Sequence, residues 1–467
     1  MNRREFLKSA LITSAIYGAG GLPSLCNIAR ADGFAAVSQR MMVNILFSGG
    51  PDMRHLFPPA YNPTPGNFGH EYWKATAAAH SIDDTSSAEQ QARWDNDYFH
   101  LTDGATTFGM SKRAEWLKDM WDAGKVALIC NMFGVTSRDH IHGQLVLNQG
   151  NISSSNLDFN RSGWGGRLAD FLGANAVALT KVPTKFCSGP HPTDPENHDN
   201  GLVIAAPDTR AFGLFRPDSG HNWTEHAMAN SLEQYYAAKR AEVPTTSPYY
   251  RIFDMDRKIR AFGEPMEARL ASVPIPPEME AFYSGDNRLN DSRFGLQVRN
   301  LYDALAANDI LNMRVASMSY GSLDTHTTQR DRFENALDDM FGRNGGLEVL
   351  FNHLPSDAKQ NTLFVLAGEF GRQIRANGEA GTDHGEGTVM IIIGDSVNGG
   401  VYGDMFPEEE LSRIWTESTP HILGQTSFEH VLAKACEWVA PSSANSIFPD
   451  HQSGPIEADL GLDGLFT

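Results

Sequence analysis

Short apolar runs recur along the chain, and most of them lead into, or follow, a segment rich in glycine, acidic residues and histidine. Runs of four to eight apolar residues bounded by turn residues are typical of strands that are buried on both faces of a sheet. The pattern predicts five such strands, at residues 41–47, 126–132, 312–318, 363–367 and 389–393.

Helical periodicity separates these strands. It is clearest at Phe333, Leu337 and Phe341, and a further helix is expected over residues 112–123. Strands that alternate with helices predict an α/β fold with a largely parallel central sheet and helices on both faces. The polar stretches at 151–162 and 181–201 are expected to be surface loops, in one domain with insertions near 62–104 and 188–290.

Composition narrows the class of protein. Of the 467 residues, 41% are hydrophobic and only 20% are charged, which supports a large core and excludes a disordered or fibrous chain. Acidic residues outnumber basic ones by 57 to 38, and the formal net charge is −19. Because nucleic acid would be repelled on average, a nucleic-acid-binding role is not expected.

The N-terminus has the features of an export signal. Arg3 and Arg4 precede a mildly apolar segment of small residues, and Ala29 to Ala31 offers a cleavage site. Residues 1–31 therefore resemble a twin-arginine signal peptide, and residues 32–467 form the exported domain. An amphipathic first helix with chance arginines is the other interpretation. After this segment no apolar run approaches the roughly 18 residues of a membrane span, so a periplasmic or secreted protein is expected.

Cysteine usage adds little chemistry. Cys130, Cys187 and Cys436 are widely spaced and odd in number, so they form neither a CxxC motif nor a disulfide framework. Cys130 lies within an apolar run and is expected to be a buried, unreactive thiol. Twin-arginine export carries folded proteins, often with a cofactor already inserted, which is consistent with a metal site.

Candidate metal ligands gather where the predicted strands end. In open α/β sheets, ligands bind at the carboxyl ends of the strands. Carboxylates and imidazoles together favour zinc, manganese or iron, whereas calcium prefers oxygen ligands alone. The candidates are Asp52, Asp324, His326, Glu369, Asp383 and His384.

Each candidate also has a plainer interpretation. Asp52 follows two glycines and is equally suited to capping a turn. The Asp-x-His pair at 324–326 faces one side if it is extended, or forms an Asx turn with a surface histidine. Glu369 either faces the site or pairs with Arg372, and the dipeptide at 383–384 is either in the site or in a solvated loop. Their repeated position after strands favours a single polar site.

Several motifs together resemble a known bacterial family. They are Gly49-Gly50-Pro51-Asp52, Arg138-Asp139-His140, Gly163-Trp164-Gly165-Gly166-Arg167-Leu168, Leu323-Asp324-Thr325-His326, Glu369-Phe370-Gly371-Arg372 and Asp383-His384. Over residues 41–440 the chain resembles the exported family of domain of unknown function 1501. That family is similar in fold to the alkaline phosphatase and sulfatase superfamily. The resemblance implies one or two divalent metals and a hydroxyl or modified-cysteine nucleophile that cleaves phosphate or sulfate esters.

The segment after the second strand is where the resemblance places the nucleophile. Ser137 or Thr136 would be the nucleophile, and Arg138 would neutralise the oxygens of the anion. His140 is either a general acid or a packing residue. Asp139 stands where relatives carry the hydroxyl, and if it faced inward it would add negative charge to the site instead. Glu369 is followed by Phe370, where the superfamily carries histidine.

The expected function is an exported metal-dependent hydrolase that acts on a small anionic phosphate or sulfate ester. The alternative is a non-catalytic exported binding or assembly protein that retains the hydrolase fold. Relatives are often encoded beside a second exported family, which would supply its partner. An exported redox protein is a third class, but the sequence has no haem, iron–sulfur or dinucleotide motif.

Overall fold

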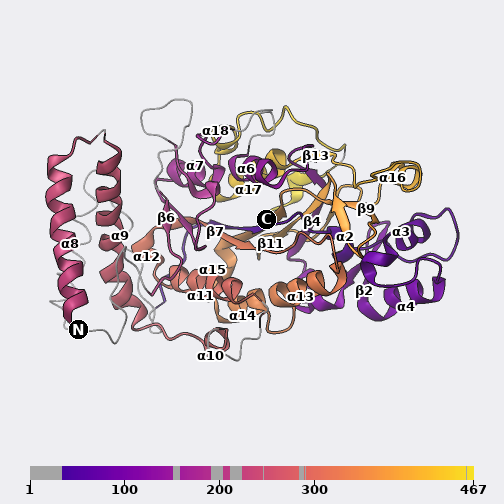
Figure 1. Ribbon diagram of the computed structural model, residues 1–467, viewed down its shortest axis with the longest axis horizontal. Helices are drawn as coiled ribbons and strands as arrows, with labels where there is room; N and C mark the ends of the chain where they lie inside the picture. Colours follow the sequence, from indigo (N-terminus) through magenta and orange to yellow (C-terminus); the bar gives the residue numbers. More distant parts are fainter. Residues whose placement is uncertain are drawn as a thin grey trace.

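A nine-stranded sheet is the centre of the described part of the chain (Figure 1). The computed structural model describes residues 34–150, 158–190, 203–210, 223–245, 247–282, 289, 291–458 and 460–467. The expected signal peptide at 1–31 lies outside the described residues, as do parts of both expected loops. The strand order is β12-β4-β11-β8-β1-β7-β5-β6, and β13 also pairs with β4.

All five predicted strands are present in this sheet. They are β1 (Met41–Phe47), β4 (Val126–Phe133), β7 (Met313–Tyr320), β8 (Thr362–Gly368) and β11 (Thr388–Ile393). β1 pairs in parallel with β7 and β8, so that Ile45 lies opposite both Met318 and Leu366. β11 runs antiparallel between β4 and β8. The other pairings in the sheet are parallel, so the sheet is largely parallel, as predicted. The remaining strands are β5 (Asn175–Ala178), β6 (Ile204–Ala205), β12 (Gly400–Tyr402) and β13 (Thr426–Ser427).

Helices cover both faces of the sheet, which explains why its strands are apolar throughout. Successive residues of β1 alternate between two cores: Val43 and Ile45 pack into one, and Met42 and Leu46 into the other. The first core is covered by α5 (Glu115–Asp122), α11 (Ser292–Ala306), α13 (Gln329–Phe341), α14 (Gly346–His353) and α15 (Ser356–Asn361). The second is covered by α6 (His140–Gln149), α7 (Trp164–Phe171), α17 (Phe428–Val439) and α18 (Ala444–Ile447).

The two expected insertions have secondary structure of their own. The first contains α3 (Phe68–Thr76), η1 (Ala77–His80), α4 (Ser87–Asp97) and β2 (Tyr98–Asp103), which forms a hairpin with β3 (Thr106–Ser111). The second contributes edge strand β6 to the sheet, and then α8 (Trp223–Glu242), α9 (Pro248–Leu270) and α10 (Pro277–Glu280). In Figure 1, α8 and α9 stand side by side at one end of the molecule. No helix among the described residues is long and apolar enough to span a membrane.

The topology brings the predicted polar segments to one edge of the sheet. β1, β4, β7 and β8 run parallel and end at the same edge, and the antiparallel β11 begins there. A small hairpin of β9 (Arg372–Ala376) and β10 (Thr382–His384) lies between β8 and β11 in the chain and completes this edge. Residues that are far apart in sequence therefore meet at a single site.

Candidate metal centre

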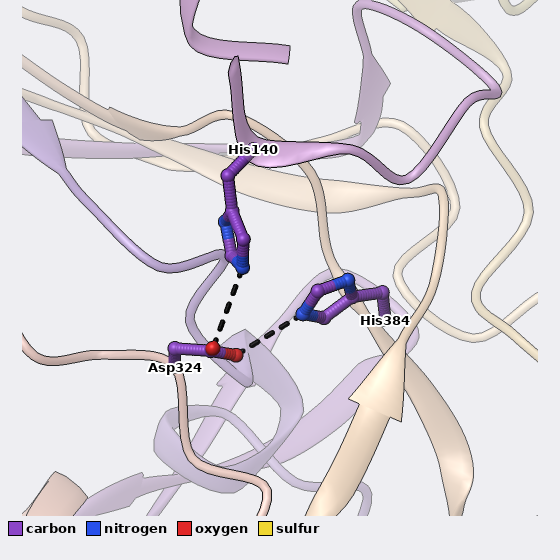
Figure 2. Close-up of side chains that lie close together, drawn as sticks. All are labelled: His140, Asp324 and His384. Atoms are coloured by element: carbon purple, nitrogen blue, oxygen red, sulfur yellow. Dashed lines mark hydrogen bonds and ion pairs between the residues drawn. The ribbon is translucent and has the colours of Figure 1, made fainter. Parts of the chain in front are cut away.

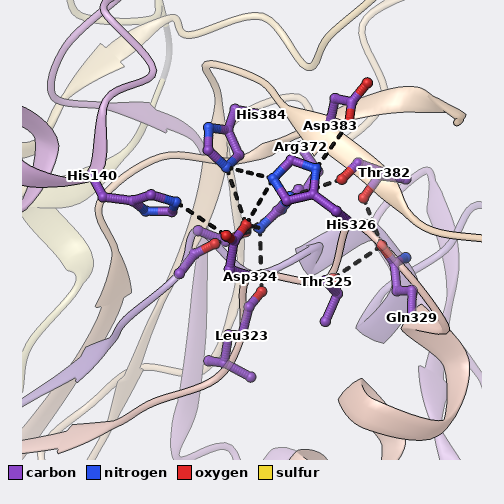
Figure 3. A network of polar contacts seen from close by, with 12 residues as sticks. His140, Leu323, Asp324, Thr325, His326, Gln329, Arg372, Thr382, Asp383 and His384 are labelled. Atoms are coloured by element: carbon purple, nitrogen blue, oxygen red, sulfur yellow. Dashed lines mark hydrogen bonds and ion pairs between the residues drawn. The ribbon is translucent and has the colours of Figure 1, made fainter. Parts of the chain in front are cut away.

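Asp324 is the residue on which the site converges (Figures 2 and 3). It follows β7 in an extended loop, and its Oδ1 atom accepts a hydrogen bond from Arg372 Nη2 at 2.5 Å. His326 Nε2 lies 3.0 Å and His384 Nε2 lies 3.1 Å from the same oxygen. His140 Nε2 lies 3.4 Å from Oδ2. Three imidazoles from three separate segments therefore point one nitrogen each at a single carboxylate.

The opposite nitrogen of each ring allows the tautomer that a metal ligand needs. Every Nδ1 atom lies within hydrogen-bond distance of a carboxylate or carbonyl oxygen, so Nδ1 can carry the hydrogen while Nε2 presents its lone pair to a cation at the centre. The three pairs are His140 Nδ1 with Glu369 Oε1 (2.8 Å), His326 Nδ1 with Asp383 Oδ1 (2.9 Å) and His384 Nδ1 with the Arg138 carbonyl oxygen (2.9 Å).

With these tautomers, the nitrogen and oxygen atoms that the histidines and Asp324 direct at the centre are all acceptors. His326 Nε2 and His384 Nε2 face each other at 3.0 Å. His140 Nε2 is buried and has no hydrogen-bond partner among the described residues. A cation placed among these atoms relieves the repulsion between them, and a histidine held from behind by a carboxylate or carbonyl is the usual arrangement at protein metal sites. The donor set therefore fits a bound metal ion.

The ligand atoms of His140, Asp324 and His384 lie within 4.8 Å of one another, as expected for atoms that share one ion (Figure 2). With His326 the set offers three nitrogen donors and one carboxylate. Nitrogen-rich sets of this kind suit zinc, manganese or iron better than calcium.

The electrostatics of the site favour the ionised form of Asp324. Burial opposes the ionisation of Asp324, but the hydrogen bond and the positive charge of Arg372 help to hold the pKa of Asp324 well below its ordinary value. The hydrogen bond to Glu369 raises the pKa of His140, whereas burial lowers the pKa of His384. The site therefore combines an ionised carboxylate with two rings whose pKa values are shifted in opposite directions.

Arg372 fixes the geometry of Asp324. Its side chain is fully buried, and its guanidinium donates to the carbonyl oxygens of Gly50 (2.6 Å), Gly49 (2.5 Å) and Thr382 (2.8 Å) as well as to Asp324. Gly49 has a φ of +121°, and a Cβ atom on it would lie 2.3 Å from the Asp324 backbone nitrogen. The loop after β1 can therefore approach the centre only because this position is glycine.

Glu369 supports the site from behind. It is fully buried, accepts from the Gly49 backbone N–H at 3.0 Å, and accepts from Gln144 Nε2 at 3.1 Å as well as from His140. Gln144 also donates to Ser48 Oγ at 2.9 Å. The acidic side chain is thus fully engaged in orienting His140, the first residue of α6.

The structure distributes the six predicted ligands over three roles. Asp324, His326 and His384 face one another at the centre, while Glu369 and Asp383 hold histidine rings from behind. Asp52 takes the capping role that the sequence also allowed.

Asp52 Oδ1 accepts from the backbone N–H groups of Arg54 and His55 at 3.1 Å and caps α2 (Met53–Leu56). Its Oδ2 accepts from Gln329 Nε2 at 2.7 Å. Gln329 Oε1 accepts in turn from Thr382 Oγ1, so Asp52 is linked to the centre only through other residues.

Two residues of the predicted catalytic segment, Arg138 and His140, contact the centre. Arg138, with a φ of +55°, holds His384 through its carbonyl oxygen, and its guanidinium donates to His421 Nδ1 at 2.8 Å. Thr136 and Ser137 are exposed. Asp139 caps α6 by accepting from the His142 N–H at 2.9 Å, so the inward-facing Asp139 considered from the sequence does not occur.

Sequence reasoning treated His140 as a general acid or a packing residue and left it out of the ligand set. The missed signal was position: His140 lies on the segment after β4, as Asp324 and His326 lie on the segment after β7. Two supporting amides carry no sequence signal that would reveal their roles. Gln144 donates to Glu369. Asn377 Nδ2 donates to the His326 carbonyl oxygen at 2.9 Å and to Asp383 Oδ1 at 3.2 Å.

Comparison with known families identifies the segment that contains most of this site. Residues 304–411 match the family model described as "Protein of unknown function (DUF1501)". This match includes Asp324, His326, Asp383 and His384, and it covers less than half of the chain. Comparison with curated proteins gave no match.

Among solved structures, the crystal structure of Thermus thermophilus alkaline phosphatase is similar with a TM-score of 0.28 and 12% sequence identity. The alignment covers 92% of this chain and 79% of that chain.

Proposed function

We propose that the chain is an exported metal-dependent hydrolase of phosphate or sulfate esters. The observation that carries the proposal is the convergence of three imidazole Nε2 lone pairs on the Asp324 carboxylate, with every ring held from behind by an acceptor. A zinc, manganese or iron ion bound there would supply Lewis acidity toward an ester oxygen.

The neighbouring segment offers groups suited to an anionic ester. Arg138 uses one N–H toward His421, which leaves other donors of its planar guanidinium for the oxygens of a phosphate or sulfate. Ser137 precedes it and is exposed, so we propose it as the nucleophile, with Thr136 as the other hydroxyl of the loop. His140, in this proposal, serves as a ligand and not as a general acid.

Metal analysis and an ester assay on the same preparation test the proposal. Protein purified without chelator should contain about one equivalent of zinc, manganese or iron and should hydrolyse aryl phosphates, phosphodiesters or aryl sulfates. Asp324→Ala and His384→Ala should lose both metal and turnover. His353→Ala is the matched control, because this histidine pairs with Glu278 away from the centre. Turnover that survives complete metal removal would contradict the proposal.

A non-catalytic exported binding or assembly protein is the second candidate, and Phe370 is the observation that favours it. The Phe370 ring is fully buried, with its centroid 5.0 Å from the His140 ring and 4.6 Å from the His384 ring. An apolar ring thus lies where the superfamily is expected to carry a further histidine. Stoichiometric metal with no turnover on any of the three ester classes would support this second candidate.

Export is part of the same proposal. Changing Arg3 and Arg4 to lysine should retain the protein in the cytoplasm, because the twin-arginine pathway depends on the arginine pair. Undiminished secretion of that variant would remove the periplasmic or secreted assignment while leaving the metal centre untouched.

A further inference from the structure

A polar cavity whose lining includes none of the metal centre's ligands lies beside α13. It has a volume of about 270 Å³ and lies between α4, the short helix η2 (Lys112–Ala114) and α13. Four basic and two acidic side chains line it: Arg93, Lys112, Arg113, Arg330, Asp97 and Glu334. An excess of positive charge around one cavity is unexpected in a chain whose net charge is −19.

The two carboxylates of this cavity are shared among three guanidinium groups. Glu334 is in ion-pair contact with Arg93, with Arg330 Nε at 3.5 Å and with Arg113 Nε at 3.6 Å. Asp97 Oδ2 contacts Arg93 Nη1 at 2.5 Å and Arg330 Nη2 at 3.4 Å. Two negative charges therefore compensate three positive ones, and like charges are held close together.

The buried member of this group keeps an unused donor. The Arg93 side chain is only 4% exposed, and its Nε atom is buried with no hydrogen-bond partner among the described residues. Leaving a buried charged donor unpaired costs more than leaving a neutral one, so a site with an additional acceptor nearby would be more stable.

The outer members of the group are available to a ligand. Arg113 is 58% exposed, and among the described residues its guanidinium makes one ion-pair contact, the long 3.6 Å contact with Glu334. The Lys112 Nζ atom donates to the carbonyl oxygens of Asn96 (2.7 Å) and Asp95 (3.3 Å), and it has no carboxylate partner in the described part of the chain. The backbone carbonyls thus hold an ammonium group in place without neutralising its charge.

We propose that this cavity binds a small dianion of the phosphate or sulfate class. Its basic groups come from three different elements, so they approach from several directions, and a tetrahedral oxyanion presents oxygens in several directions whereas a carboxylate presents two in one plane. A volume of about 270 Å³ admits such an anion with a few waters. The site is separate from the metal centre and does not depend on the proposed hydrolase function.

Titration calorimetry with inorganic phosphate and sulfate tests the inference. The Asp324→Ala chain, freed of metal with chelator, is used throughout, so that no anion binds at the metal centre. Saturable binding is expected at low ionic strength. Arg113→Ala and Lys112→Ala should each weaken it by about tenfold, the loss of one charge-assisted hydrogen bond. These variants are used because Arg93→Ala would leave Glu334 buried without its principal partner.

Arg343→Ala is the matched control. This arginine is half exposed and pairs with Glu115 and Glu348 at 2.9 Å and with Asp119 at 2.6 Å, outside the cavity lining, so its loss should leave anion affinity unchanged. The inference is overturned if neither phosphate nor sulfate binds saturably, or if the three variants lose affinity equally. Tighter binding of malonate than of both inorganic anions would overturn the assigned ligand class.

Discussion

The Nε2 atoms of His326 and His384 lie 3.0 Å apart, and both belong to rings whose hydrogen is directed to the opposite nitrogen. Neither atom can donate to the other in the neutral tautomers that Asp383 and the Arg138 carbonyl select. Together with the Asp324 carboxylate, this contact is stable only with a proton or metal cation between the rings.

Asp383 should contribute to metal affinity without binding the metal. Asp383→Ala removes the acceptor that orients the His326 ring, so affinity should fall by about 10- to 100-fold while the fold is retained. Competition with a chromogenic chelator measures the change. Glu379→Ala, an exposed acidic position in the same hairpin loop, should bind metal as the parent does. Equal affinity of the two variants would show that His326 needs no such support.

Metal affinity should fall as the pH decreases, and the fall should begin at a higher pH than a histidine with an ordinary pKa would give. The hydrogen bond to Glu369 raises the pKa of His140, so a proton occupies this ring at higher pH than usual and competes with the metal. Removing the charge in Glu369→Gln should lower the pKa of His140 and move the midpoint of metal loss to lower pH. Chelator competition across the pH range measures both midpoints, and a midpoint that stays in place would contradict the assigned cause.

Ser137 should be required for turnover but not for metal binding. Ser137→Ala removes the proposed nucleophile and should lower ester hydrolysis at least about 100-fold with unchanged metal content. Thr136→Val alters the adjacent exposed hydroxyl and should retain most activity. Full activity of Ser137→Ala would assign the attack to water.

Gly49 should be intolerant of any side chain. In Gly49→Ala the new Cβ atom would meet the Asp324 backbone at 2.3 Å, in a backbone region with a φ of +121° that L-residues avoid. The free energy of unfolding should fall by at least about 2 kcal/mol, and metal affinity should fall with it because Asp324 must move. Urea unfolding measures this change. Gly378 has open space around it, so Gly378→Ala should leave the free energy of unfolding nearly unchanged.

The three described cysteines should be unreactive in the folded protein. Cys130, Cys187 and Cys436 are buried free thiols, and burial raises the pKa of each. A chromogenic thiol reagent should therefore label none of them in the folded chain lacking residues 1–31 and all three in urea, because the thiolate is the reacting form. Rapid labelling of the native protein would mean that at least one of these segments opens readily.

The sequence by itself was sufficient for the sheet and for the place of the site. Apolar runs on β1, β4, β7, β8 and β11 have only one way to bury both faces, which is in a sheet covered by helices on both sides. Parallel strands end at one edge, so the polar residues that follow them had to gather there. Asp324 and His326, two residues apart in an extended loop, face the same side for the same local reason.

Only the tertiary structure decided which of these residues meet. Asp52 and His140 both follow strands at that edge, yet the first caps α2 and the second faces Asp324. The difference arises because the backbone N–H groups of α2 lie within reach of the Asp52 carboxylate, whereas Glu369 holds the His140 ring toward the centre. The cap of Asp52 is local, but its second oxygen is held by Gln329, 277 residues away, and His140 is held by Glu369, 229 residues away. No local pattern encodes which of these distant partners is near enough to form the hydrogen bond.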